Sequence, residues 1–336
     1  RGRDILVVGA PVLTFWAIWS LSADASLEAP FLDYMLVPLE VTTLGRLFAT
    51  IFTLMAFVGG LFALRQAGRG ELAAAFVYAG GAVGVPFAGD LITMFVFWEL
   101  MAIGSTLVIW CAGTAQARAA GMRYVLMHLL GGVILMTGII AEINRTGSID
   151  FTAVDLEGAG AWCMLVGILI NAAAPPFAAW LPDAYPEASP SGSVFLSAFT
   201  TKTAVYVLMV VFAGTKILIP IGLIMAFYGI IYALLENDMR RILAYSIVNQ
   251  VGFMVTGIGI GTPLALNGVA AHAFCHIIYK ALLLMSAGAV LHQTGKRRCT
   301  DLGGLFQSMP VTTICGIIGA LAISRFPLPS GFVSTT

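Results

Sequence analysis

The chain consists of long apolar segments that follow one another with short connections, and this pattern constrains its fold most strongly. Segments of bilayer-spanning length fall at about 4–21, 44–64, 71–88, 91–111, 119–143, 160–179, 193–212, 216–235, 242–260, 263–291 and 309–323. An apolar run of this length is typical of a transmembrane helix. The sequence therefore predicts an all-α polytopic membrane protein with about eleven transmembrane helices.

The composition excludes a soluble domain and a nucleic-acid-binding protein. Of the 336 residues, 59% are hydrophobic and only 10% are charged, whereas soluble domains carry roughly 25% charged residues. The chain has 17 basic and 17 acidic residues, so no net charge attracts nucleic acid, and no basic run is interleaved with aromatic residues. The surface of this protein is expected to lie in the lipid bilayer.

The basic residues of the loops predict which ends of the segments share a side of the membrane. Loops on the cytoplasmic side carry most of the Lys and Arg residues. Eleven basic residues lie on the side of Arg1, and three, Arg46, Arg145 and Lys216, lie on the other. We therefore expect the N-terminus and the loop 292–308 to lie in the cytoplasm.

Two ionisable residues lie deep inside apolar segments. Glu99 is set in GDLITMFVFWELM and Lys202 in SAFTTKTAVYVLM, and a charge at bilayer depth costs at least ~2.5–3.5 kcal/mol. Asp90 is most simply a helix N-terminal carboxylate. Glu99 either takes part in transport or holds helices together, and Lys202 is its expected partner. Such a pair can store or release a proton as the charges separate.

A second ionisable group follows a helical spacing in the segment 263–291. His272, His276 and Lys280 recur at every fourth residue, so they project from one helix face. Histidine passes protons through its two ring nitrogens, and the row is a potential proton relay. A metal site is the weaker alternative, because no further Cys, Asp or Glu lies nearby in the sequence. His128 is isolated on its helix and is interpreted as a core residue.

Prolines interrupt two of the segments. Pro175 and Pro176 lie in INAAAPPFAAWLP, and Pro327 and Pro329 lie in ISRFPLPSGF. Proline removes a backbone donor and frees carbonyls that can serve ions or water. The two breaks are either ordinary kinks or signs of an inverted repeat. In the second interpretation, the single membrane domain 1–336 contains a five-helix repeat at 71–212 and an incomplete one at 216–336.

No cofactor motif is found. Four of the five cysteines lie in apolar segments without CxxC spacing, and no GxxxxGK[ST] or Rossmann glycine motif occurs. We expect no metal, flavin, haem or nucleotide. The chain begins at Arg1 and is expected to be a fragment.

Several stretches resemble the proton-conducting membrane subunits shared by respiratory complex I and the multisubunit Na⁺/H⁺ antiporters of Mrp type, most closely the D-type subunits of these antiporters. They are GDLITMFVFWELM, PPFAAWLPDAYPEASPSGSVFLSAFTTKTAVYVL, ENDMRRILAYSIVNQVGFM, HAFCHIIYKALLLMSAGAV and ISRFPLPSGFVS. They cover 89–334 in the family order. The resemblance implies an antiporter-like fold with broken helices, truncated at both ends relative to the fourteen helices of the family.

The resemblance also implies roles for individual residues. Glu99 matches the family's fifth-helix glutamate, Lys202 its eighth-helix lysine, and His272, His276 and Lys280 its eleventh-helix row. Two positions depart from the pattern, because Asn171 and Thr335 stand where lysines are common. Either Lys202 substitutes for the seventh-helix lysine, or this is a paralogue that no longer pumps.

The sequence thus predicts a membrane subunit of a multisubunit cation/proton antiporter that conducts protons along a buried Glu/Lys/His axis. The expected partners are other membrane subunits, H⁺, Na⁺ and the lipid bilayer, and the expected location is a bacterial inner membrane. The alternatives are a subunit of a complex I-like NADH:quinone oxidoreductase or membrane hydrogenase, and a non-pumping structural subunit.

Overall fold

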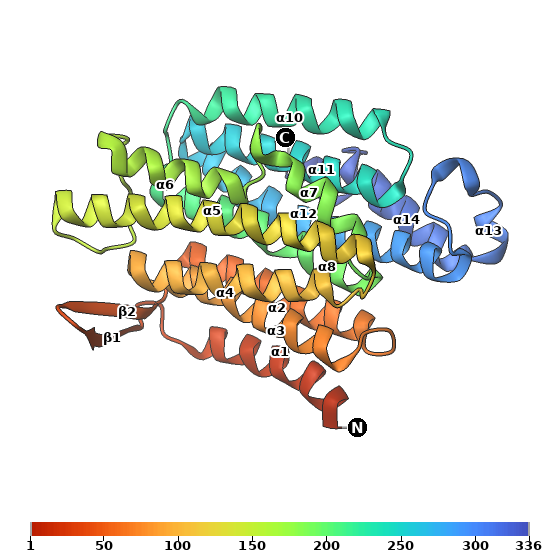
Figure 1. Cartoon of the computed structure of the whole chain (residues 1–336), viewed down its shortest axis with the longest axis horizontal. Helices are drawn as coiled ribbons and strands as arrows, with labels where there is room; N and C mark the ends of the chain where they lie inside the picture. The colour runs from red at the N-terminus through yellow and green to blue at the C-terminus, as the bar shows by residue number, and fades with distance from the viewer. Residues whose placement is uncertain (1, 335–336) are drawn as a thin grey trace.

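The computed structural model describes residues 2–334, and most of them form long helices that run side by side (Figure 1). The uninterrupted long helices are α1 (Gly2–Ser20), α2 (Thr43–Ala63), α3 (Arg69–Gly84), α4 (Leu91–Trp110), α5 (Ala115–Thr146), α10 (Leu218–Leu235), α11 (Met239–Ile260) and α12 (Pro263–Thr294). The shorter ones are α6 (Gly158–Asn171), α7 (Trp180–Ala184), α8 (Pro190–Ala198), α9 (Thr200–Val211), α13 (Leu305–Ser308), α14 (Pro310–Ile323) and α15 (Ser330–Val333).

The helices confirm the predicted multi-pass membrane fold. Within residues 2–334, nine helical spans are long and apolar enough to cross a membrane, and the shorter apolar helices α6 and α14 occupy the two remaining predicted segments. The 32 residues of α5 and of α12 correspond to ~48 Å of helix, longer than the hydrocarbon core of a bilayer. These two helices must tilt or extend beyond the lipid.

One element was not predicted. The connection between α1 and α2 forms a hairpin of β1 (Ser26–Phe31) and β2 (Tyr34–Glu40) at one end of the bundle (Figure 1). Asp90 ties the hairpin to α4, because one carboxylate oxygen accepts the Thr93 amide at 2.7 Å and the other the Val37 amide at 2.8 Å. Asp90 is therefore an N-cap of α4, as its place in the sequence suggested.

Contacts between loops show that alternate connections gather at opposite ends of the bundle. At the hairpin end, the amide of Leu91 bonds to the carbonyl of Ile149 at 2.8 Å, which joins two neighbouring loops. At the other end, the Arg297 guanidinium lies 2.7 Å from the Asp238 carboxylate. α13 and the N-terminal end of α1 also lie at that end (Figure 1). The structure thus has the alternation that the loop charges predicted.

Glycines bring neighbouring helices into backbone contact. A Cβ added at Gly138 on α5 would lie 2.5 Å from the Met164 amide of α6, and one at Gly167 would lie 2.8 Å from the Leu135 amide. Small residues allow this approach where lipid offers no hydrophobic driving force.

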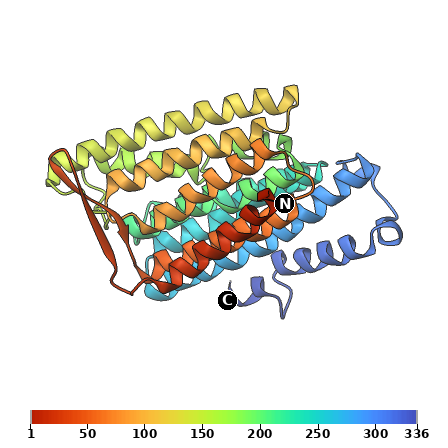
Figure 2. The ribbon, with the colours of Figure 1, turned by 90° about the horizontal axis from the view of Figure 1, so that it is seen from below.

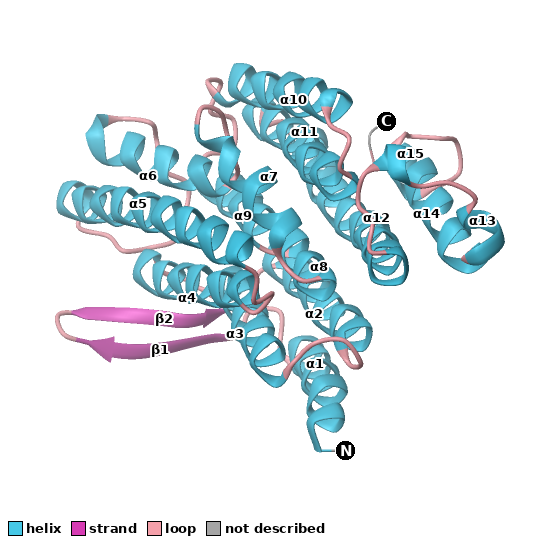
Figure 3. Cartoon of the chain, turned by 45° about the vertical axis from the view of Figure 1, so that its right-hand side comes forward, coloured by secondary structure: helices cyan, strands magenta, loops and turns pink. Residues whose placement is uncertain are grey.

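In Figure 2 the C-terminal helices lie along the edge opposite α5, and in Figure 3 α14 packs beside α12.

Arg240 has a structural role at the start of α8. Its side chain is buried and donates hydrogen bonds to the carbonyls of Ala188 and Ser189, at 2.7 and 3.1 Å, and to the Ser193 hydroxyl. These contacts hold the segment that begins α8. Arg241, by contrast, is paired with Glu236 at 3.6 Å.

Candidate functional site: a buried polar axis

Glu99 lies on α4 where that helix packs against α5. Its Oε1 atom is buried and has no hydrogen-bond partner among the described residues. The carboxylate lies directly against Gly132 of α5, at a place where any Cβ would collide with it. A glycine at this position therefore makes room for an acidic side chain inside the helix pair.

Lys202 lies immediately after a break that the sequence did not predict. The apolar segment 193–212 is interrupted at Phe199, whose φ and ψ are −104° and −69°. The break leaves the Ser197 carbonyl outside the helical ladder, and Lys202 Nζ donates a hydrogen bond to it at 2.6 Å. The lysine side chain is completely buried. An interrupted helix thus supplies the polar partner that a lysine needs at bilayer depth.

The expected direct pair between Glu99 and Lys202 is not formed. Among the described residues, no carboxylate oxygen of Glu99 lies within ion-pair distance of a basic group, and the hydrogen bond of Lys202 goes to a carbonyl of its own span. Spacing along the chain places each residue on a helix but does not fix the distance between helices. The prediction of a contact pair was wrong.

A group of hydroxyls occupies the region of the break. The hydroxyls of Tyr78 and Thr200 lie 2.5 Å apart, and the Thr200 amide donates to Tyr78 at 2.9 Å. The Tyr124 hydroxyl donates to Ser105 at 2.9 Å and lies 3.5 Å from Thr200. These residues were not selected from the sequence. Their signal was tyrosine and threonine inside apolar segments, which is too common to single them out.

The row on α12 faces the interior as its spacing predicted. His272 binds Gln250 through Nε2 at 3.0 Å and Ser334 through Nδ1 at 3.1 Å. The rings of His272 and His276 are stacked, with centroids 6.1 Å apart. Lys280 donates to the Ser246 hydroxyl. His276 is completely buried, and neither ring nitrogen has a hydrogen-bond partner among the described residues.

Lys202 lies near this row and joins the two halves of the site, which are the polar residues of α4 to α9 and the row on α12. It is close enough to His276 and to Lys280 to interact electrostatically with both. Two buried amines and a buried imidazole on α9 and α12 therefore share one region. A proton on one of them changes the energy of protonating the others.

The helix break at the predicted prolines begins before them. α6 ends at Asn171, and α7 begins at Trp180, whose indole donates to the Ile170 carbonyl at 2.9 Å. Asn171 is buried at this helix end. The second break separates α14, which ends at Ile323, from α15, and it contains Pro327 and Pro329. Thr335 lies outside the described residues.

His128, interpreted above as a core residue, lies beside Asn171. It is buried on α5, and its ring centroid is 4.1 Å from that of Tyr124 and 4.7 Å from that of Trp180. Asn171 lies within interacting range of the imidazole. In the described geometry neither ring nitrogen makes a hydrogen bond. No sequence signal distinguished this histidine from a satisfied core residue.

We call these residues the polar axis; Glu99 is half-buried and all the other members are buried. It consists of Glu99, His128, Asn171, Tyr124, Thr200, Lys202, His276, Lys280 and His272.

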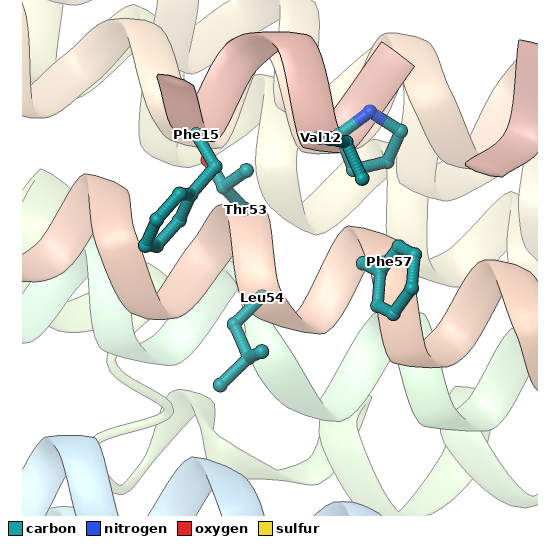
Figure 4. Close-up of a pocket in the computed structure, with 6 residues that line it drawn as sticks. Val12, Phe15, Thr53, Leu54 and Phe57 are labelled. Carbon is teal, nitrogen blue, oxygen red and sulfur yellow. The ribbon is translucent and has the colours of Figure 1, made fainter. Parts of the chain in front are cut away.

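A cavity of about 230 Å³ between α1 and α2 lies apart from the polar axis (Figure 4). Phe15, Leu54 and Phe57 line that cavity, and none of the described residues that line it is ionisable, so it has no part in the polar axis.

Two proteins are similar in sequence to most of this chain. The D-type subunit of the Na⁺/H⁺ antiporter of Alkalihalophilus pseudofirmus is 30% identical over 88% of this chain, and the hydrogenase-4 component B of Escherichia coli is 26% identical over 91%. The chain spans 66% of the first protein and 51% of the second. It is thus shorter than both.

Solved structures share the fold. The Mrp complex of Dietzia sp. contains a chain that matches 98% of this one with a TM-score of 0.86, and this chain covers 66% of it. A chain of the archaeal membrane-bound sulfane sulfur reductase matches 99% with a TM-score of 0.88, and 73% of it is covered. Both are 24% identical in sequence, so they establish the fold alone. Residues 88–336 match the family described as NADH:quinone oxidoreductase/Mrp antiporter, transmembrane, and the chain belongs to that family.

Proposed function

We propose that this chain is the proton-conducting membrane subunit of a multisubunit cation/proton antiporter. The observation that carries the proposal is the polar axis, in which ionisable side chains recur from α4 to α12 inside an apolar bundle. Buried ionisable groups are costly in a membrane and usually mark an ion or proton path. In this proposal Glu99, Lys202, His276, Lys280 and His272 hold the proton in turn.

The helix breaks have a defined part in this mechanism. The broken segment at Phe199 gives the Lys202 ammonium a carbonyl acceptor, so the lysine can hold its proton within the bundle. When a second proton arrives on His276 or Lys280, electrostatic repulsion favours release of the proton that Lys202 holds. Charge on one half of the polar axis is thereby coupled to charge on the other.

We also infer an internal repeat. α6–α7 is the fourth span counted from residue 71, and α14–α15 is the fourth counted from residue 216. Matching positions of the two breaks support an inverted repeat over 71–212 and 216–336. The loop charges support an N-terminus and a 292–308 loop on the cytoplasmic side of a bacterial inner membrane. Other membrane subunits and Na⁺ are the proposed partners.

A second candidate is a membrane subunit of a redox-driven pump. The likeness to hydrogenase-4 component B and to a chain of a respiratory membrane complex favours it. The two candidates share the polar axis and differ in the energy source. In the antiporter a cation gradient moves protons, whereas in the redox pump electron transfer in partner subunits does so.

Proton movement in vesicles that contain the purified complete complex distinguishes these functions. With an imposed Na⁺ gradient and no electron donor, an internal pH indicator should report proton movement that stops when the gradient is dissipated. The same measurement with K⁺ identifies the exchanged cation. Proton movement that requires an electron donor and does not depend on a Na⁺ or K⁺ gradient would replace the antiporter proposal by the redox pump.

The contact between Glu99 and Gly132 provides a test of the geometry. In Gly132→Ala the added Cβ would collide with the Glu99 carboxylate, which is the end of a flexible side chain and can move aside. We expect a small change in thermal stability and about a tenfold loss of exchange, because a displaced proton-transfer group is strongly penalised.

The matched control for that variant is Gly80→Ala on α3, where an added Cβ meets no atom within 4 Å. It should exchange at the wild-type rate. If Gly132→Ala exchanges as fast as this control, the position of the Glu99 carboxylate does not matter for transport.

A further inference from the structure

The contact between α5 and the end of α6 holds two polar side chains without partners. Both ring nitrogens of His128 and Oδ1 of Asn171 are buried and make no hydrogen bond among the described residues. His128 is 2% exposed and Asn171 is also 2% exposed. Buried polar atoms are normally satisfied, and exceptions require an explanation. Two such side chains in one contact point to a shared role.

His128 lies on α5 between Gly132, which contacts Glu99, and Tyr124. Gly132, against which the Glu99 carboxylate packs, follows His128 by four residues on α5, so the two lie one above the other on the same helix face. On the other side, the His128 ring contacts Tyr124, whose hydroxyl lies 3.5 Å from that of Thr200. Thr200 begins α9, the helix that carries Lys202. His128 thus bridges a gap that the absent Glu99–Lys202 contact leaves open.

The side chains that α6 and α7 place against His128 are uncharged. α6 contributes the amide of Asn171, and α7 contributes the indole of Trp180, beside which Tyr185 packs with ring centroids 5.7 Å apart. The charged side chains of Arg123 on α5 and Asp183 on α7 bind each other through hydrogen bonds of 2.7 and 2.8 Å and are partly exposed. Glu99 faces the same helix from α4.

We propose that His128 carries the proton between Glu99 and Lys202, with Asn171 as its neighbour across the contact. This inference rests on the proposed function. A proton taken up at one ring nitrogen forms the imidazolium, and loss of the proton from the other nitrogen restores the neutral ring. The transfer needs no other reactant. In this proposal α5 supplies the titratable side chain of the contact, which is His128. The family pattern would instead supply a lysine from position 171 on α6.

Swapping the two side chains between positions 128 and 171 tests the proposal. His128→Asn removes the imidazole, and His128→Asn with Asn171→His returns it from the opposite side of the same contact. We expect the single variant to lose exchange by about 100-fold and the swapped variant to regain most of it. His292→Asn is the control, because His292 is an exposed histidine at the end of α12.

All variants are measured in vesicles with the complete complex, after copurification of the partner subunits has shown equal assembly. The swapped variant should also keep the pH profile of exchange of the wild type, since it retains an imidazole. If the single variant does not assemble, the swapped variant alone decides.

Three results would overturn the inference. An assembled single variant that exchanges at the wild-type rate overturns it and leaves the proposed function intact. An assembled but inactive swapped variant shows that the loss comes from packing rather than from proton transfer. No exchange by the wild-type complex overturns the proposed function and this inference with it.

Discussion

Replacing Lys202 by methionine is expected to abolish cation-driven proton exchange. The lysine is completely buried, donates to the Ser197 carbonyl at 2.6 Å and lies near His276 and Lys280. Methionine fills a similar volume but cannot bind a proton, so packing is largely kept while the link between the two halves of the polar axis is lost. Exchange in vesicles should fall by at least about 100-fold.

The same substitution at Lys216 separates this effect from a general loss of a lysine. Lys216 is exposed in the connection before α10, and Lys216→Met should exchange normally. Lys202→Met also leaves the Ser197 carbonyl without its donor, which costs about 1–3 kcal/mol, so assembly and thermal stability are measured first. Retained exchange in an assembled Lys202→Met complex would exclude Lys202 from the proton path.

Replacing Glu99 by glutamine is expected to have an effect of comparable size. Glutamine keeps the shape that fits against Gly132 but has no proton to give or take. Because Oε1 of Glu99 has no hydrogen-bond partner among the described residues, the substitution removes no structural contact of that atom. Exchange should fall by at least about 100-fold with little change in thermal stability.

Glu28→Gln provides the comparison, because Glu28 lies exposed on the β1–β2 hairpin. This variant should exchange as the wild type does. If Glu99→Gln instead lowers assembly with the partner subunits and exchange to the same extent, Glu99 serves assembly and its role in proton transfer is wrong.

Much of the fold follows from the sequence because apolar length determines it directly. Each predicted segment contains a helix, and α6 ends near Pro175 and Pro176 while α14 ends before Pro327. The hairpin 26–40 does not follow from apolar length, because it lies in a connection between two spans. The break at Phe199 was not predicted either, since no proline or glycine marks it in SAFTTK.

The site was predictable residue by residue but not as an arrangement. Depth in an apolar segment singled out Glu99 and Lys202, and four-residue spacing singled out the row on α12. Which residues meet depends on helix crossing and on glycines such as Gly132 that allow close approach. For that reason the Glu99–Lys202 pair was expected wrongly, and His128 gained significance only beside Asn171.

We propose that protons cross the membrane along the polar axis of this chain. The most direct test is proton flux driven by an imposed Na⁺ or K⁺ gradient in vesicles containing the complete complex, compared with the complex in which Glu99→Gln and Lys202→Met are combined. Equal amounts of assembled complex are compared. We expect flux in the first vesicles and only the leak of protein-free vesicles in the second. Equal flux in both would contradict it and make this chain a structural subunit of a path that lies elsewhere.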